Sequence, residues 1–205
     1  MTLLIPNPPQ VQKVVLFFDI CSSTVILEDL LRTENVKLWR NLLLNLRDYL
    51  NKRRTDDGFE IYKFMGDGWV LLFNADTRAE VIFELMKGLS NRYAQLHTST
   101  IRNVLTIEIA NLGIAFGIDR GTLVKVVMNN RFEYIGQPLN VAARLQSAIS
   151  DNDSKPAGKV LISNNAFVGM RPELQGEYRI ENASRSLRNI AGGRKYLCKK
   201  VTLFP

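Results

Sequence analysis

Two short apolar stretches, each containing an aspartate, dominate the pattern of hydrophobic and polar positions along the chain. In the first, Val14–Phe18 runs directly into Asp19, and a continuous apolar run of this length is typical of a strand buried on both faces. In the second, Glu60–Phe73, two apolar arms flank Gly66–Gly68, a glycine-aspartate-glycine sequence that predicts a tight β-hairpin. Both aspartates are therefore expected at the tips of strands.

Helical periodicity marks three other stretches. Leucines at helical spacing predict a long helix from about Thr24 to Lys52, with a break near Arg32–Asn35. A second helix is expected to end near Leu96, and a third, rich in alanine, covers Leu139–Ile149. The remaining strands are predicted at 105–118, 122–128, 160–162, 178–180 and 196–203, with a turn at 119–121.

This order of elements predicts an α+β fold. A strand, a long helix, a hairpin, a second helix and further strands favour a ferredoxin-like split β-α-β core, with a mostly antiparallel sheet and helices on one face. Residues 1–13, which include three prolines, are expected to form an extended N-terminal lead-in. Residues 14–205 contain no internal repeat or linker and are expected to form a single domain.

Composition narrows the choice of chemistry. The chain has 205 residues and a net charge of +7, which favours anionic partners such as nucleotides, nucleic acid or acidic lipid. With two cysteines and one histidine, the sequence argues against a disulfide framework, a zinc centre and serine-protease chemistry. We see no signal peptide and no apolar run long enough to span a membrane, so a cytoplasmic location is expected.

The surroundings of the two aspartates suggest phosphate chemistry. Ser22, Ser23 and Thr24 follow Asp19 and read as the N-cap of a helix, whose free backbone N–H groups suit phosphate. Two acids at neighbouring strand tips beside such a turn are what a two-metal phosphoryl-transfer site requires. For Asp67 alone, an ordinary aspartate-glycine turn is the alternative interpretation.

A third group of candidate residues lies on the alanine-rich helix. Asn140 and Arg144 are four positions apart and therefore share one helix face. An amide and a guanidinium projecting together can hold a ribose oxygen and a charged phosphoryl group. A pair of exposed polar residues with no function is the alternative.

Together these motifs resemble the catalytic domain of class III nucleotidyl cyclases, over roughly Val14 to Leu203. FFDICSST resembles the family's first metal-aspartate motif and KFMGDG its second. GIDRG matches the family's internal glycine-isoleucine strand turn, and YIGQPLNVAARLQ resembles its asparagine-arginine helix. Each motif is weak alone, but four in the family's order and spacing are specific.

The resemblance implies roles for these residues. It implies that Asp19, Asp67 and the Ile20 carbonyl bind two divalent ions, Mg²⁺ or Mn²⁺. The turn that contains Ser22 and Ser23 would then cradle the triphosphate. The ribose 3′-OH attacks the α-phosphorus in line and pyrophosphate leaves.

On the opposite side of the substrate, the resemblance implies that Asn140 orients the ribose and Arg144 stabilises the α-phosphoryl oxygens. Arg188 falls near the family's terminal-phosphate cation, which is usually a lysine. The family builds its site from two chains, so a head-to-tail homodimer with composite sites is implied. Asp19 and Asp67 would come from one protomer, and Asn140 and Arg144 from the other.

Two positions correspond to the family's base readers, Lys63 and Glu133. A lysine donor with a carboxylate acceptor fits adenine, uracil and cytosine, so hydrogen-bond logic does not choose among them. The longer glutamate and the bulky Tyr62, Phe64 and Met65 favour a smaller pocket. With no sensor or membrane module in the sequence, the chain most resembles the stand-alone pyrimidine cyclases of bacterial antiphage Pycsar systems, which make cyclic UMP or cyclic CMP.

UTP is therefore the expected substrate, followed by CTP. An adenylate cyclase with a separate regulator and a non-catalytic nucleotide sensor are the alternatives. A polymerase-palm or other nucleic-acid-binding domain is a further alternative, since polymerases also bind two metal ions at acidic residues. The helix with Asn140 and Arg144 would have no function in such a domain. Because no sheet face shows interleaved aromatic and basic residues, we expect no nucleic-acid partner.

Overall fold

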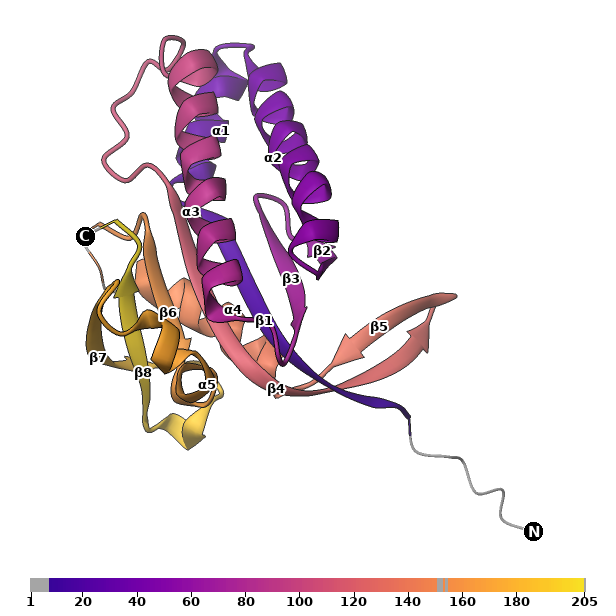
Figure 1. Cartoon of the computed structure of the whole chain (residues 1–205). Coiled ribbons are helices and arrows are strands. Elements are labelled where there is room, and N and C mark those ends of the chain that lie inside the picture. The colour runs from indigo at the N-terminus through magenta and orange to yellow at the C-terminus, as the bar shows by residue number, and fades with distance from the viewer. Residues whose placement is uncertain (1–7, 151–152, 154, 205) are drawn as a thin grey trace.

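An eight-stranded sheet forms the centre of the molecule in the computed structural model, which describes residues 8–150, 153 and 155–204 (Figure 1). Seven strands follow the order β2-β3-β1-β4-β6-β8-β7, and β5 pairs with the outer part of β4. The pairing of β4 with β6 is parallel, and the other pairings among the described residues are antiparallel. The strands are β1 (Gln10–Ile20), β2 (Phe59–Phe64), β3 (Gly68–Asn74), β4 (Ile114–Met128), β5 (Arg131–Ile135), β6 (Lys159–Ser163), β7 (Arg179–Ser186) and β8 (Lys195–Thr202).

Five α-helices accompany the sheet within the described residues. The predicted long helix is broken where the sequence indicated, because α1 ends at Arg32, Glu34 adopts a positive φ of 58°, and the next helix begins at Val36. A π-helical turn, His97–Ile101, extends the third helix. The helices are α1 (Ser23–Arg32), α2 (Val36–Asp56), α3 (Ala79–Leu96), α4 (Gln137–Ser150) and α5 (Asn164–Leu174).

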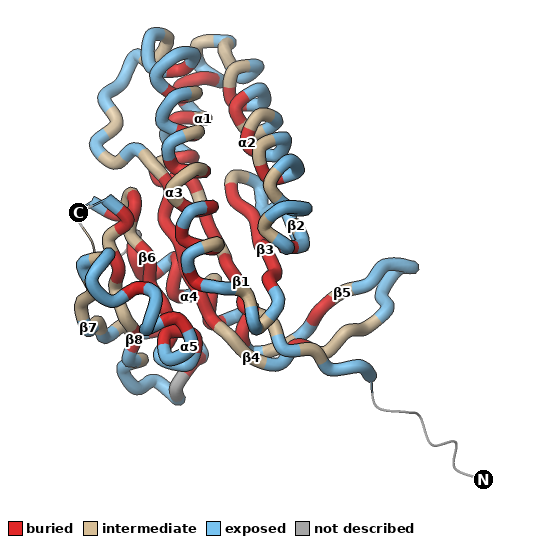
Figure 2. Tube along the Cα trace, viewed as in Figure 1, coloured by how far each residue is buried: buried red, intermediate tan, exposed pale blue. Residues whose placement is uncertain are grey.

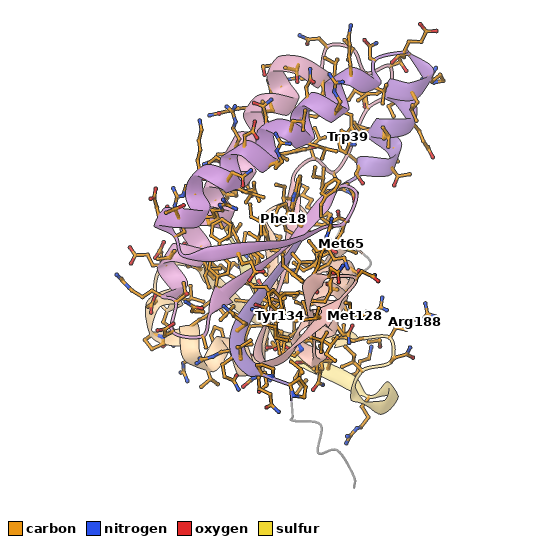
Figure 3. The ribbon with its side chains drawn as sticks, turned by 90° about the vertical axis from the view of Figure 1, so that its right-hand side faces the viewer. Phe18, Trp39, Met65, Met128, Tyr134 and Arg188 are labelled. Atoms are coloured by element: carbon orange, nitrogen blue, oxygen red, sulfur yellow. The ribbon has the colours of Figure 1, made fainter. Side chains whose placement is uncertain are left out.

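The sheet is covered on both faces, which corrects part of the prediction. The mostly antiparallel α+β fold is confirmed, and Leu16 and Phe18 of β1 pack in the main core with α1, α2 and α3 (Figure 3). Val15 faces the other way and packs in a separate cluster with Ala142 of α4. Helices on one face alone would leave half of β1 exposed, since successive strand residues point to opposite faces. Figure 2 shows the buried residues that result, running along β1, β3 and β4.

β4 is one continuous strand, although a strand at 105–118, a turn at 119–121 and a second strand were predicted. It begins at Ile114 and continues through the expected turn, where Asp119 pairs with Val15 of β1 and Gly121 with Lys13. Long-range pairing to β1 therefore overrides the local turn signal. Asp119 is buried, and the hydroxyl of Ser163 donates a hydrogen bond to its carboxylate.

β1 begins earlier than predicted. Residues 1–13 were expected to be an extended lead-in, but Gln10 already pairs with Val124 of β4. Residues 1–7 of this predicted segment lie outside the described residues. The outer half of β4 and all of β5 form an arm that projects from the body of the sheet, beside the start of β1 (Figure 1).

Asp29, on α1, ties the segment before β4 to the helical layer. Its buried carboxylate accepts hydrogen bonds from the backbone N–H of Thr106, at 2.8 Å, and from the Thr106 hydroxyl, at 2.6 Å. Arg32 pairs with the same carboxylate. The hydrogen bonds from Thr106, followed by Arg32, lower the pKa of Asp29 below its ordinary value of 3.8. The charged carboxylate is therefore the form that holds this segment.

We expect Asp29→Asn to lower the unfolding temperature and to flatten its dependence on acidic pH. The pKa is lower in the folded than in the unfolded state, so the stabilising contribution is complete above 3.8 and is lost as the pH falls below that value. Thermal unfolding followed by circular dichroism at neutral and acidic pH measures both effects. Asp48→Asn is the control, because Asp48 is exposed and pairs with its neighbour Arg47. Equal unfolding temperatures for the two variants at neutral pH would contradict the role of Asp29.

Candidate active site

Two aspartates meet at one edge of the sheet. Asp19 is the next-to-last residue of β1 and pairs with Gly68, the first residue of β3. Asp67 lies in the turn directly before Gly68. The two carboxylates are within hydrogen-bonding reach of each other, and burial, followed by the contact with Asp67, raises the pKa of Asp19 to about 7. Two acidic groups held together in this way form a site that a cation stabilises.

The glycines around Asp67 allow this close approach. An added Cβ at Gly68 would overlap the carbonyl oxygen of Phe18 and lie 2.8 Å from Oδ1 of Asp19. Gly66 has a φ of +101°, which a residue with a side chain rarely adopts. The backbone N–H of Met65 donates to the Gly68 carbonyl at 2.9 Å and closes the turn. The predicted hairpin is confirmed. Its glycines are needed both for the turn and for the close approach of Asp67 to Asp19.

The serines after β1 hold the site rather than point freely into it. Ser22 is the N-cap of α1 in a left-handed conformation, and its hydroxyl donates to the carbonyl of Asn111 at 3.0 Å. The hydroxyl of Ser23 donates to the Asp67 carboxylate. Ile20, the last residue of β1, is buried. Ser23 was predicted as a phosphate contact, and in this structure it also positions an aspartate.

The donor set suits a hard divalent cation that is shared with a phosphate. No cluster of three or more histidine, cysteine, aspartate or glutamate side chains with metal-binding geometry occurs among the described residues. Mg²⁺ is commonly held by one or two carboxylates together with substrate phosphates and water. Asp19 and Asp67 provide these carboxylates, and the neighbouring carbonyl of Ile20 is an oxygen donor of the same kind.

The predicted base readers form a second cluster, between β2 and β5. The hydroxyl of Tyr62 donates to Oε2 of Glu133 at 2.6 Å, and Nζ of Lys63 lies 3.9 Å from the same oxygen. Burial, followed by this hydrogen bond to Glu133, raises the pKa of Tyr62. The structure thus brings Glu133 to the neighbouring residues Tyr62 and Lys63, from which it is separated by about seventy positions in the sequence.

Sequence reasoning missed Tyr134, which positions this cluster. Its backbone N–H donates to the Tyr62 hydroxyl at 3.0 Å, and the two rings meet edge to face at 5.4 Å. Tyr134 is nearly buried, whereas its neighbours Glu133 and Ile135 are more exposed. The sequence carried no signal for this role, because the contact to Tyr62 is made by a backbone N–H.

The third cluster lies on α4 and the segment after β7. Asn140, Arg144 and Arg188 line one pocket of about 480 Å³. All three residues are exposed to solvent. Gln137 and Asn189 add two amide groups that the sequence analysis did not identify. The pocket presents two guanidinium groups and three amides, a lining suited to phosphate and ribose oxygens.

A single chain therefore carries the predicted residues in three clusters. The pocket formed by Asn140, Arg144 and Arg188 includes neither Asp19 nor Asp67. The predicted pairings within each cluster are observed, whereas the two halves of the expected catalytic site are not joined in one pocket. No helix among the described residues has the length and apolar content needed to cross a membrane.

The fold is that of adenylyl and guanylyl cyclase catalytic domains. No family model and no curated protein sequence matches the chain. Among solved structures, the adenylyl cyclase CyaB from P. aeruginosa is similar with a TM-score of 0.68 and 21% sequence identity, over 96% of both chains. The guanylyl cyclase Cya2 gives a TM-score of 0.65 and 19% identity, over 96% of this chain and 94% of that one.

A bacterial light-regulated adenylyl cyclase has a TM-score of 0.69 and 17% identity to this chain. The match covers 99% of this chain but about half, 55%, of that protein. At such identities the comparisons establish the architecture, and the chemistry has to be argued from the residues themselves.

Proposed function

We propose that the protein is a class III nucleotidyl cyclase, which converts a nucleoside triphosphate into its 3′,5′-cyclic monophosphate and pyrophosphate. The carboxylate pair of Asp19 and Asp67 is the observation that carries this proposal. Two half-buried acids at adjoining strand tips, one with its pKa raised to about 7, are unfavourable without a cation. The cyclase fold and the phosphate-suited lining of the α4 pocket support the same function.

Each residue has a role in this reaction. Asp19, Asp67 and the Ile20 carbonyl hold two divalent ions, Mg²⁺ or Mn²⁺, which when bound activate the 3′-hydroxyl and neutralise the triphosphate. Ser23 keeps Asp67 in place through its hydrogen bond. The positive φ of Ser22 bends the chain at the start of α1. The Cys21 N–H donates to the Gly113 carbonyl, so phosphate would be bound by the N–H groups that follow it in the first turn of α1.

The α4 pocket supplies the other half of the site. Asn140 orients the ribose, Arg144 binds the α-phosphoryl oxygens, and Arg188 binds the terminal phosphate. Arginine suits both phosphate positions because it stays charged and presents a fork of donors. We propose that two chains associate head to tail, so that this pocket of one protomer faces the aspartates of its partner. The separation of the two clusters within one chain supports this arrangement.

We further propose that the base is a pyrimidine, with UTP preferred over CTP. Glu133 accepts the Tyr62 hydroxyl on Oε2, which leaves Oε1 to accept a base N–H, while Lys63 donates to a base oxygen. Tyr62 is held in place by Tyr134, and in this proposal its bulk narrows the base site to the size of a pyrimidine. A cyclic pyrimidine nucleotide made in this way would act as a second messenger in antiphage defence. ATP is the alternative substrate, because the same donor and acceptor also fit adenine.

Incubation with Mn²⁺ and ATP, GTP, UTP or CTP, followed by mass spectrometry, tests the proposal. We expect cyclic UMP as the main product, with less cyclic CMP, because the Tyr62 side of the base site favours the smaller ring. Cyclic AMP as the main product would contradict the pyrimidine preference and retain the cyclase. No cyclic product from any of the four would contradict the cyclase and favour a nucleotide-binding sensor, which equilibrium binding of the same nucleotides would then test.

A further inference from the structure

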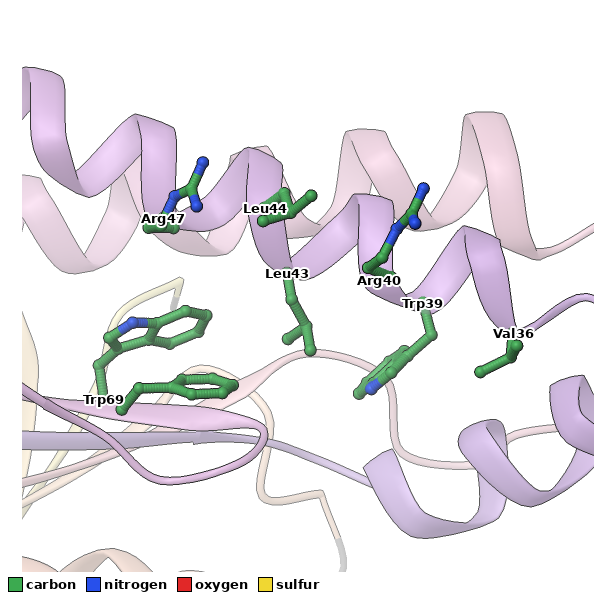
Figure 4. A pocket seen from close by; sticks show the side chains of 8 residues that line it. Val36, Trp39, Arg40, Leu43, Leu44, Arg47 and Trp69 are labelled. Carbon is green, nitrogen blue, oxygen red and sulfur yellow. The ribbon is translucent and has the colours of Figure 1, made fainter.

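An apolar groove of about 420 Å³ lies between α2 and the β2–β3 hairpin, outside the three clusters described above (Figure 4). Its volume is within the range of small-molecule sites. Several of its apolar residues remain accessible, since Val36, Leu44 and Phe64 are 42%, 37% and 51% exposed. The apolar lining consists of Val36, Trp39, Leu43, Leu44, Phe64 and Trp69.

The groove is elongated along α2. Its helical wall runs from Val36 to Arg47, which at a rise of about 1.5 Å per residue gives a length of about 17 Å. Leu43 and Trp39 point from this wall toward the hairpin, where Trp69 forms the opposite side (Figure 4). A long, narrow apolar surface of this kind suits an extended acyl chain better than a compact ring.

Two arginines, Arg40 and Arg47, also line the groove. Figure 4 shows their guanidinium groups on the outer side of α2, pointing away from the hairpin. Arg47 already pairs with Asp48, at 2.8 Å. Arg40 contacts Asn41 at 3.3 Å, and no carboxylate of the described residues lies within ion-pairing distance of it. The groove therefore combines an apolar lining with one cation that has no anionic partner in the described part of the chain.

We propose that this groove binds a single fatty-acid anion. Its hydrocarbon tail lies along the apolar lining, and its carboxylate lies at the outer rim of the groove, where the Arg40 side chain turns to pair with it. Burial of the tail against Trp39, Leu43 and Trp69 provides most of the affinity, because apolar area removed from water is stabilising. The carboxylate determines orientation and selects the anion over a neutral molecule of the same length.

Charge argues against the arm of a second copy as the occupant. The arm formed by β4 and β5 has exposed apolar residues, Val127, Met128 and Phe132. It also carries Lys125, whose ammonium lies 4.0 Å from the centre of the Phe132 ring. Docking this arm would bring a further cation to a groove that already holds two arginines, which is unfavourable.

The groove is coupled to the aspartate turn. Phe64 and Trp69 are the residues on either side of the turn that carries Asp67, and their rings pack at 4.8 Å. A bound chain packs on these rings and restricts the turn. This regulatory part rests on the proposed cyclase function: a bound fatty acid raises turnover by holding Asp67 in place. Binding itself does not depend on that function.

Intrinsic fluorescence of the full-length chain measures binding directly, because the chain contains two tryptophans and both line the groove. The probe is dodecanoate below its micelle concentration, compared with dodecanol. We expect a saturable change with dodecanoate and weaker binding of dodecanol. Arg40→Gln weakens dodecanoate binding about fivefold, as expected for a partly exposed ion pair. Arg47→Gln has a smaller effect, since Arg47 is already paired.

Two matched controls separate the groove from general effects. Arg54→Gln changes an exposed arginine on the same helix outside the groove and leaves binding unchanged. Leu44→Gln weakens binding, whereas Leu31→Gln, at another exposed leucine, does not. Any loss of folding is detected by circular dichroism.

Several results would overturn the proposal. The first two are no saturable fluorescence change with dodecanoate, and binding of dodecanol as tight as that of dodecanoate. The other two are a fluorescence change with anionic vesicles but none with dodecanoate, and a change that depends on the protein concentration and not on the dodecanoate concentration. If no nucleotide is cyclised, the proposed function fails while the titration still decides binding. If cyclic nucleotide forms and saturating dodecanoate leaves its rate unchanged, the coupling to Asp67 is wrong.

Discussion

Replacing Asp67 by alanine is expected to abolish cyclic nucleotide formation while the fold is retained. The substitution removes one of the two carboxylates that hold the metal ions, and we expect turnover to fall by about 10³-fold or more. The fold should survive because Asp67 lies in a turn, and because its removal relieves the contact that helps to raise the pKa of Asp19. Product formation by mass spectrometry and unfolding by circular dichroism measure the two outcomes.

Asp76→Ala is the matched control for this experiment. Asp76 is an exposed aspartate in the turn after β3, nine residues further along the chain, and it belongs to none of the three clusters. Its variant should keep the parent rate. An Asp67→Ala protein that is folded and still turns over at the parent rate would show that the aspartate pair is not the catalytic centre.

Mixing two inactive variants is expected to restore activity. In a head-to-tail dimer of an Asp19→Ala chain with an Arg144→Ala chain, one site carries both substitutions and the other carries neither. If the subunits exchange at random, half of the dimers are mixed and each has one intact site, so about a quarter of the parent activity returns. Either variant alone stays inactive. Activity assays before and after mixing measure the recovery directly.

The control is a mixture of Asp19→Ala with Asp67→Ala. Both residues lie in the same cluster, so every site in a mixed dimer lacks one carboxylate and activity should not return. Exchange of subunits is verified with differently tagged chains. If exchange occurs and the Asp19 and Arg144 variants show no recovery, each site is built within one chain.

The local pattern of the sequence was sufficient for the elements that carry the aspartates. The apolar run before Asp19 and the two arms around Asp67 predicted β1 and the β2–β3 hairpin, since both features depend on neighbouring residues. Their meeting at one edge followed from the same pattern. The break between α1 and α2 was also visible as a polar interruption of the leucine spacing.

Features that depend on distant pairing were not predictable in the same way. The turn expected at 119–121 is a strand because Asp119 pairs with Val15, and no local signal in Asp119-Arg120-Gly121 indicates this partner. The position of α4 on the second face of the sheet is likewise a property of the assembled strands. A close backbone approach secures it, since a Cβ at Gly117 would overlap the Ala142 carbonyl.

In the candidate site, too, the residue types could be identified from the sequence, whereas the contacts between distant residues could not. Tyr62 was identified from its bulk and Glu133 from the motif, but the hydrogen bond between them depends on β5 folding back on β4. Tyr134 was missed because its contribution is a backbone N–H, which every residue except proline has. Arg188 was identified through resemblance to a family motif, and the structure places it in one pocket with Asn140 and Arg144; its role in phosphate binding stays a prediction.

The central position of β1 has a consequence for how the protein is made. Val15 pairs with Leu72 on one side and with Asp119 on the other, so the pairing of β1 is completed only after the chain as far as β4 has been synthesised. Sheets with such distant partners fold slowly, because a long loop must close before pairing stabilises it. Until then one edge of the apolar run Val14–Phe18 has no partner strand, although β3 can already pair with its other edge. A nascent chain that has reached β3 but not β4 therefore exposes one edge of an apolar strand, which is a site for aggregation. The aspartate pair needs only β1 and the β2–β3 hairpin, so it can form before the rest of the sheet.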